Sequence, residues 1–141
     1  MKDIQNAIAQ LDWKREPYGL YEPIEYILNL GGKRLRPMLA VLASQIFNGN
    51  KEDVIPAALA LEVFHNFTLL HDDVMDKADM RRGHPTVHTK WNENTAILSG
   101  DQMMIEAYKQ KHFAYTISWV AKVSYALIGS SQRESRSTCS R

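Results

Sequence analysis

An acidic cluster at residues 72–79 is the part of this sequence best suited to carry chemistry. Asp72 and Asp76 are four residues apart, so in a helix they lie on one face, about one turn from each other. His65 falls on nearly the same face, roughly 10 Å along the axis, and Asp73 points away but stays close. Carboxylates this near to one another repel, and they oppose the dipole of a helix C-terminus. We therefore expect a compensating cation, and carboxylate oxygens suit Mg²⁺.

Two short basic segments, GGKRLRP at 31–37 and RRG at 81–83, could bind an anion beside that metal. Lys33 offers a point charge and Arg36 a planar fork, which together suit a diphosphate. The alternative is a helix C-cap followed by cations that the dipole favours. His65 could likewise be a core histidine, but its place on the aspartate face favours the site. Because the helix that leads away from the aspartates is apolar, the pattern predicts a diphosphate attached to a hydrocarbon.

Composition narrows the class of protein. The chain has 141 residues, 45% hydrophobic and 23% charged, which suits one domain with one core. Residues 1–109 carry 12 basic and 15 acidic residues, so no nucleic-acid partner is expected. A single cysteine excludes an internal disulfide and points to a reducing, cytoplasmic location. No apolar run reaches the roughly 18 residues of a membrane span, and no signal-peptide pattern opens the chain.

Hydrophobic periodicity predicts an all-α body at residues 1–109, with no strand before residue 110. Helix 54–70 is apolar around most of its circumference, which is typical of a central helix. Residues 110–141 have no clear period and end in a Ser/Arg-rich stretch, so we expect an atypical basic tail. The predicted helices span residues 3–13, Pro23 to the glycines at 31–32, Pro37 to Asn48, 53–77 and 94–108.

GGKRLRP at 31–37 and LLHDDVMD…RRG at 69–83 resemble the first characteristic blocks of the trans-isoprenyl diphosphate synthases, or polyprenyl synthetases. The resemblance runs from about residue 20 to 109 and includes ILSGD at 97–101. It implies a partial isoprenoid-synthase helical bundle, truncated after about five helices. It also implies a trans-prenyltransferase of isoprenoid biosynthesis, which adds isopentenyl diphosphate head-to-tail to an allylic diphosphate with Mg²⁺ as cofactor.

The resemblance also implies roles for individual residues. Arg81 matches a ligand of the allylic diphosphate, and Asp72 and Asp76 match Mg²⁺ ligands, with Asp73 in support. Phe67 and Thr68 precede Asp72 by five and four residues, at positions that resemble those of short-chain synthases making C15 to C20 products. Helical arithmetic places Thr68 about 40° from the Asp72 direction and Phe67 about 140° away. The residues that match the isopentenyl diphosphate site are Lys33, Arg36, His65 and Arg82; Lys33, Arg36, Asp72 and Asp76 are the expected catalytic set.

The sequence departs from the family in its second half. Family members carry a second aspartate-rich motif, whereas Asp101 is the only aspartate after Asp79 here. We therefore expect an impaired enzyme. Apolar faces left uncovered on 54–70 and 94–108 predict a homodimer or other self-association.

Two other functions stay open from the sequence. The pair His71-Asp72, with His65, His84 and His88, could form an HD-type metal-dependent phosphohydrolase site. A non-catalytic subunit of a heteromeric prenyl synthase would keep the diphosphate pocket without turnover.

Overall fold

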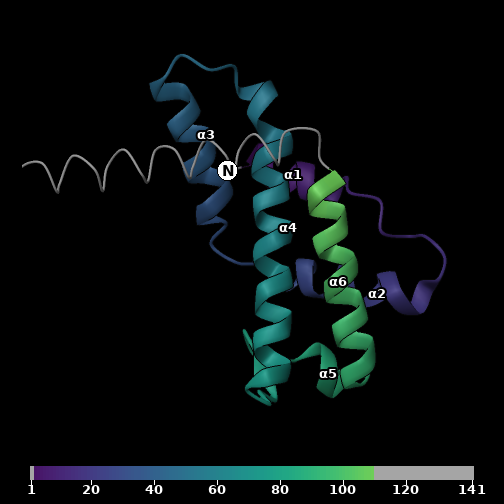
Figure 1. Cartoon of the computed structure of the whole chain (residues 1–141). Helices are drawn as coiled ribbons and strands as arrows, with labels where there is room; N and C mark the ends of the chain where they lie inside the picture. Colours follow the sequence, from purple (N-terminus) through teal and green to yellow (C-terminus); the bar gives the residue numbers. More distant parts are fainter. Residues whose placement is uncertain (1, 110–141) are drawn as a thin grey trace, which may run out of the picture.

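The computed structural model describes residues 2–109, and within that range its regular elements are helices and one small hairpin (Figure 1). The all-α prediction is confirmed, and the predicted tail at 110–141 lies outside the described residues. One helix more than the five predicted is present, the four-residue α5. The elements are α1 (Lys2–Ala9), α2 (Tyr18–Asn29), α3 (Leu35–Ile46), α4 (Lys51–Met75), β1 (Met80–Arg81), β2 (His84–Pro85), α5 (Val87–Lys90) and α6 (Glu93–Lys109).

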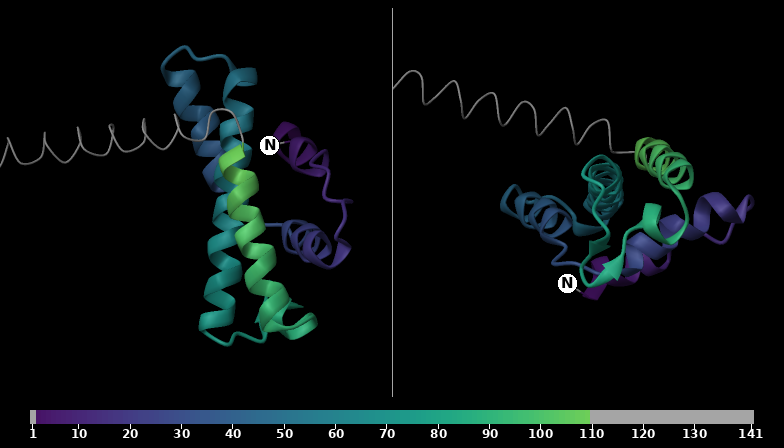
Figure 2. Two further views of the ribbon diagram at one scale, coloured as in Figure 1. Left: turned by 45° about the vertical axis from the view of Figure 1, so that its right-hand side comes forward. Right: turned by 90° about the horizontal axis from the view of Figure 1, so that it is seen from below.

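Helix α4 is the centre of the fold, as its apolar circumference predicts. Helices α3 and α6 lie on either side of it, and α1 and α2 pack across one face of this layer (Figures 1 and 2). The main core cluster joins α2, α4 and α6 through side chains such as Ile24, Leu70 and Met103, which are at most 1% exposed. By length and composition alone, Glu52–Met75 could also cross a membrane. Its packing between α3 and α6 accounts for the same apolar composition.

The ends of α4 differ from the prediction of 53–77 by two residues each. Asn50 is the N-cap, and its side chain accepts a hydrogen bond from the Glu52 amide at 3.2 Å. At the other end Asp76 is the C-cap, and its amide donates to the Asp72 carbonyl at 2.8 Å. The two aspartates therefore keep their one-turn spacing although the helix ends between them.

Both prolines that were expected to start helices lie inside them. Helix α2 begins at Tyr18, so the prediction that it starts at Pro23 is wrong. Pro23 removes one backbone hydrogen bond, but it is fully buried beside Ile24, and this packing outweighs the loss. Helix α3 begins at Leu35, which leaves Pro37 in the first turn, where no amide partner is lost.

The hairpin of β1 and β2 contradicts the prediction of no strand before residue 110. Arg81 pairs with His84, so Arg82 and Gly83 alone form the loop, with φ of 53° and 80°. Two central residues with positive φ define the tight turn that matches the twist of a hairpin. Strands of two residues are too short to show the alternation that sequence analysis depends on. At the base, the Thr86 hydroxyl donates to the Ala78 carbonyl at 2.7 Å.

Large apolar side chains are exposed on α3 and α6. The expectation for 94–108 is confirmed, since Leu98 is 59% exposed. The expectation for 54–70 is wrong, because no large hydrophobic residue there is exposed in the described structure. The uncovered residues are instead Leu35, Leu39, Leu42 and Ile46 on α3, and Ile97, Leu98, Ile105 and Tyr108 on α6.

Candidate functional site

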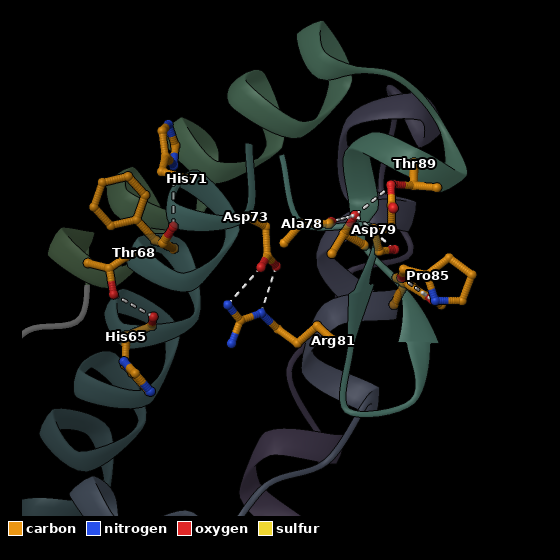
Figure 3. A network of polar contacts seen from close by, with 12 residues as sticks. His65, Thr68, His71, Asp73, Ala78, Asp79, Arg81, Pro85 and Thr89 are labelled. Carbon is orange, nitrogen blue, oxygen red and sulfur yellow. Dashed lines mark hydrogen bonds and ion pairs between the residues drawn. The ribbon is translucent and has the colours of Figure 1, made fainter. Parts of the chain in front are cut away.

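The three aspartates at the end of α4 have different environments. Asp73 is 3% exposed, and both of its carboxylate oxygens accept hydrogen bonds from Arg81, each at 2.7 Å (Figure 3). Asp72 and Asp76 are exposed, and within residues 2–109 neither carboxylate makes a hydrogen bond or ion pair. One of the clustered charges is thus compensated by an arginine rather than a metal, and two carboxylates are left available.

The Asp73–Arg81 pair fastens the hairpin to α4, and this brings Arg82 beside the glycine turn before α3. Gly31 and Gly32 have φ of 76° and 146°, which favour glycine. A Cβ atom on Gly32 would lie 3.0 Å from Nη2 of Arg82 and 3.1 Å from its Cζ. The absence of a side chain at position 32 therefore lets the guanidinium rest against the turn.

A pocket of about 390 Å³ lies where the glycine turn, α4 and the hairpin meet. Its lining includes all four side chains that were predicted to hold isopentenyl diphosphate, although they come from three separate segments. Their convergence is a property of the fold; their role in binding stays a prediction. The lining residues are Gly32, Lys33, Arg34, Leu35, Arg36, Glu62, His65 and Arg82.

The pKa of His65 reflects the positive charge around this pocket. Burial lowers the pKa of its imidazole below the ordinary value of 6.5, and the charge of Arg36 lowers it further. Arg82 and Arg81 act in the same direction, while Glu62 opposes them. Cations from two turns therefore surround one ring, and such a concave basic surface favours an anionic ligand.

Arg81 connects the basic pocket to the aspartates. Its hydrogen bonds to Asp73 raise its pKa, and the charges of Asp72 and Asp76 add to the effect. The same guanidinium contributes to the lowered pKa of His65. The basic pocket and the acidic end of α4 thus share one side of the molecule, and the spacing of His65 and Asp72 along α4 agrees with this placement.

The donor set at the end of α4 fits Mg²⁺. Asp72 and Asp76 present hard carboxylate oxygens one turn apart, and Mg²⁺ normally binds one or two carboxylates and completes its shell with water and phosphate. Both carboxylate oxygens of Asp73 accept hydrogen bonds from Arg81, so the support predicted for it in metal binding is indirect in this arrangement. No group of three or more His, Cys, Asp or Glu side chains gathers closely enough, within the described residues, to form an all-protein metal cage.

His71 does not join the histidines that the phosphohydrolase alternative needs. Its Nδ1 lies 3.3 Å from the Phe67 carbonyl, and its Nε2 lies 3.5 Å from Oδ1 of Asp101. The ring also packs against Gly100, where a Cβ atom would come within 2.4 Å of it. His71 therefore belongs to the contact between α4 and α6, and the described residues offer no support for an HD-type site.

The two residues predicted to set product length lie on different sides of α4. The Phe67 ring contacts Phe64 and His71, with ring centroids 5.3 and 4.8 Å apart, on the side that meets α6. The Thr68 hydroxyl donates to the His65 carbonyl at 2.8 Å (Figure 3). This placement agrees with the helical arithmetic. The influence of either residue on product length stays a prediction.

Sequence reasoning missed Arg34, Glu62 and Asn66. Arg34 lies within the basic segment 31–37 and was given no role, but it is 7% exposed and pairs with buried Glu62. Asn66 is fully buried and donates to the Glu62 carbonyl at 2.8 Å. The available signal was a polar pair spaced i, i+4 within an otherwise apolar stretch of helix, since buried polar groups need partners.

Comparison with known proteins follows the same features. A sequence model of the family described as "Polyprenyl synthetase" matches residues 17–129, which extends past the predicted boundary at 109. Geranylgeranyl diphosphate synthase of Methanosarcina mazei is 46% identical over 106 residues, 75% of this chain and 33% of that protein. The corresponding enzyme of Saccharolobus solfataricus is 48% identical over 90 residues, 64% of this chain and 27% of that protein.

Solved structures agree with the sequence matches. Geranylgeranyl pyrophosphate synthetase of Geoglobus acetivorans superposes with a TM-score of 0.77 at 39% identity, covering 86% of this chain and 42% of that one. The Pyrococcus horikoshii synthetase gives a TM-score of 0.76 at 34% identity, covering 94% of this chain and 43% of that one. This chain belongs to the polyprenyl synthetase family, and it spans about a third of the length of the curated relatives it matches.

We predict that Arg36→Gln raises the pKa of His65, because it removes the neighbouring charge that disfavours the imidazolium. The lowered pKa also implies that the folded state loses stability as the pH falls below 6.5, since the unfolded chain then binds more protons. NMR titration of the imidazole measures the pKa, with His65→Gln identifying the signal, and urea unfolding at several pH values measures the loss of stability. Lys90→Gln, which removes a cation 3.9 Å from the Tyr26 ring, is the control and should leave the His65 pKa unchanged. A His65 pKa that falls in Arg36→Gln would contradict the prediction.

Proposed function

We propose that this chain carries the diphosphate-binding part of a trans-prenyltransferase that condenses isopentenyl diphosphate with an allylic diphosphate in isoprenoid biosynthesis. The convergence of Lys33, Arg36, His65 and Arg82 on one pocket supports this function most directly. The exposed carboxylates of Asp72 and Asp76 add a metal-binding face on the same side. Membership of the polyprenyl synthetase family agrees with the proposal.

In the proposed reaction the allylic carbon–oxygen bond breaks, the alkene of isopentenyl diphosphate attacks the resulting cation, and a proton is lost. No nucleophilic side chain is required. Lys33 and Arg36 hold the isopentenyl diphosphate from the turn before α3, and Arg82 holds it from the hairpin. Arg81, anchored by Asp73, faces the allylic diphosphate and stabilises the negative charge that builds on it as it leaves.

Asp72 and Asp76 are the proposed ligands of Mg²⁺, each giving one carboxylate oxygen. When bound, Mg²⁺ supplies Lewis-acid neutralisation of the allylic diphosphate. Asp73 acts through Arg81 and keeps its charge and fork in place. We propose cytoplasmic action, and plant relatives from Capsicum annuum and Catharanthus roseus are named chloroplastic.

We propose a C20 product, within the C15 to C20 range that Phe67 and Thr68 indicate. Several similar relatives are named geranylgeranyl diphosphate synthases. Other matched structures are named heptaprenyl and decaprenyl diphosphate synthases, so the fold by itself does not fix the length. Thr68 shares the ridge of His65 and Asp72, which makes it the better candidate for meeting a growing chain.

The function is tested by adding isopentenyl diphosphate, with and without Mg²⁺, to the full chain and measuring binding by calorimetry. Labelled isopentenyl diphosphate with geranyl or farnesyl diphosphate then reports condensation as label in an organic-soluble product. We expect this chain to bind isopentenyl diphosphate but to form little product. The reason is that family members carry a second aspartate-rich motif, which this sequence lacks. Absence of any diphosphate binding would contradict the proposal. If this chain makes no product but activates a complete synthase when the two are mixed, the non-catalytic subunit would be favoured.

Substitution of the aspartates should separate two roles. Asp72→Asn and Asp76→Asn should each weaken the Mg²⁺-dependent part of diphosphate binding by at least about tenfold, about 1.4 kcal/mol, with little effect on stability. Asp73→Asn should instead destabilise the fold, because it leaves Arg81 without its charged partner. Calorimetry and urea unfolding measure the two effects. Asp79→Asn is the matched control on the exposed segment after α4, and equal losses in all four variants would contradict this division.

We propose that the chain self-associates, as a homodimer or a larger assembly, through the exposed apolar residues of α3 and α6. Leu39 and Ile46 are 61% and 76% exposed on one side of α3, and burial of such residues drives association. Light scattering at micromolar concentration should give a mass above that of one chain, and Leu39→Gln with Ile46→Gln should lower it. A clean monomer of the unaltered chain contradicts this expectation.

A further inference from the structure

Arg34 lies in the middle of the basic segment but does not behave as a third binding cation. It is 7% exposed, whereas its neighbours Lys33 and Arg36 are exposed on the pocket. Its Nη1 donates to Oε1 of Glu62, and its Nη2 donates to the Leu28 carbonyl at 2.5 Å. The guanidinium therefore joins the end of α2, the turn before α3 and the middle of α4.

Glu62 is an unusual group for a pocket that is otherwise basic. It is 3% exposed, and its Oε1 also accepts a hydrogen bond from Asn66 at 3.2 Å. It lies one turn before His65 and lines the same pocket. A bare carboxylate here would repel a diphosphate, and burial weakens solvent screening of that repulsion. Arg34 cancels this charge from within the fold.

The backbone at Arg34 supports the same interpretation. Arg34 is the N-cap of α3 and has φ of 47°, a conformation that non-glycine residues rarely adopt without support from their surroundings. Its contacts with Glu62 and Leu28 supply that support. Since Lys33 and Arg36 flank it in the chain, the direction of both binding side chains depends on how Arg34 is held.

We propose that Arg34 is a positioning residue that neutralises Glu62 and fixes the turn from which Lys33 and Arg36 bind isopentenyl diphosphate. This inference rests on the proposed function and extends it to a residue that does not contact the ligand. It predicts effects of opposite sign for the two partners. Loss of Arg34 releases a negative charge into the pocket, whereas loss of the Glu62 charge leaves an additional cation there.

The test is a double-substitution cycle on the full chain, with isopentenyl diphosphate binding measured by calorimetry. We expect Arg34→Met to lower the affinity at least about tenfold and Glu62→Gln to bind at least as tightly as the unaltered chain. The double variant Arg34→Met/Glu62→Gln should recover most of the loss. The matched control is the Arg15–Glu106 pair on another surface, 3.6 Å apart, where Arg15→Met and Glu106→Gln should leave the affinity unchanged.

A variant that fails to fold must be distinguished from one that folds but binds weakly. Urea unfolding checks that each variant folds, and Arg34→Lys is the second variant in case Arg34→Met does not. A lysine keeps the charge but cannot reach both Glu62 and the Leu28 carbonyl, so we expect a several-fold loss of affinity. If Glu62→Gln weakens binding as much as Arg34→Met, or if the double variant shows no recovery, the inference is wrong. If the unaltered chain does not bind isopentenyl diphosphate, the proposed function fails instead.

Discussion

The ion pair between Asp73 and Arg81 determines the geometry of the whole site. It is buried on the aspartate side and bidentate, which fixes orientation as well as distance. Because Arg81 is held against α4, the turn that follows must place Arg82 next to Gly32. The hairpin is also held at its base, where the Tyr26 hydroxyl donates to the Pro85 carbonyl and the Thr86 hydroxyl to the Ala78 carbonyl, but the Asp73–Arg81 pair is the contact next to Arg82 in the chain.

The pair also explains how one helix end can contain so many acidic groups. Removing a partner from a buried ion pair is costly, so Asp73 and Arg81 are each required by the other. Asp72 and Asp76 differ because water screens them, and two solvated carboxylates can remain unpaired at small cost. Burial therefore gives these three aspartates different roles. Asp73 holds Arg81, whereas Asp72 and Asp76 remain available.

Much of this arrangement could be predicted from the sequence. The apolar circumference of 54–70 indicated a central helix, and the spacing of His65, Asp72 and Asp76 placed them on one face. The start of α2 could not be predicted, because Pro23 is a local signal for a helix start and only tertiary packing overrides it. The hairpin was missed since four strand residues carry no alternation. The available signal for its turn was Gly83, because a glycine adopts the positive φ that the second loop residue needs.

Arg34 shows a different limit of prediction from sequence. Local sequence groups it with Lys33 and Arg36, and only the position of Glu62 on a separate helix reveals that its charge is already neutralised.

Gly31 and Gly32 are not interchangeable, although both have positive φ. Open space surrounds position 31, so asparagine there would meet only backbone strain. Any side chain at position 32 would displace the Arg82 guanidinium, which makes that glycine a spacer that sets the separation between the two basic segments.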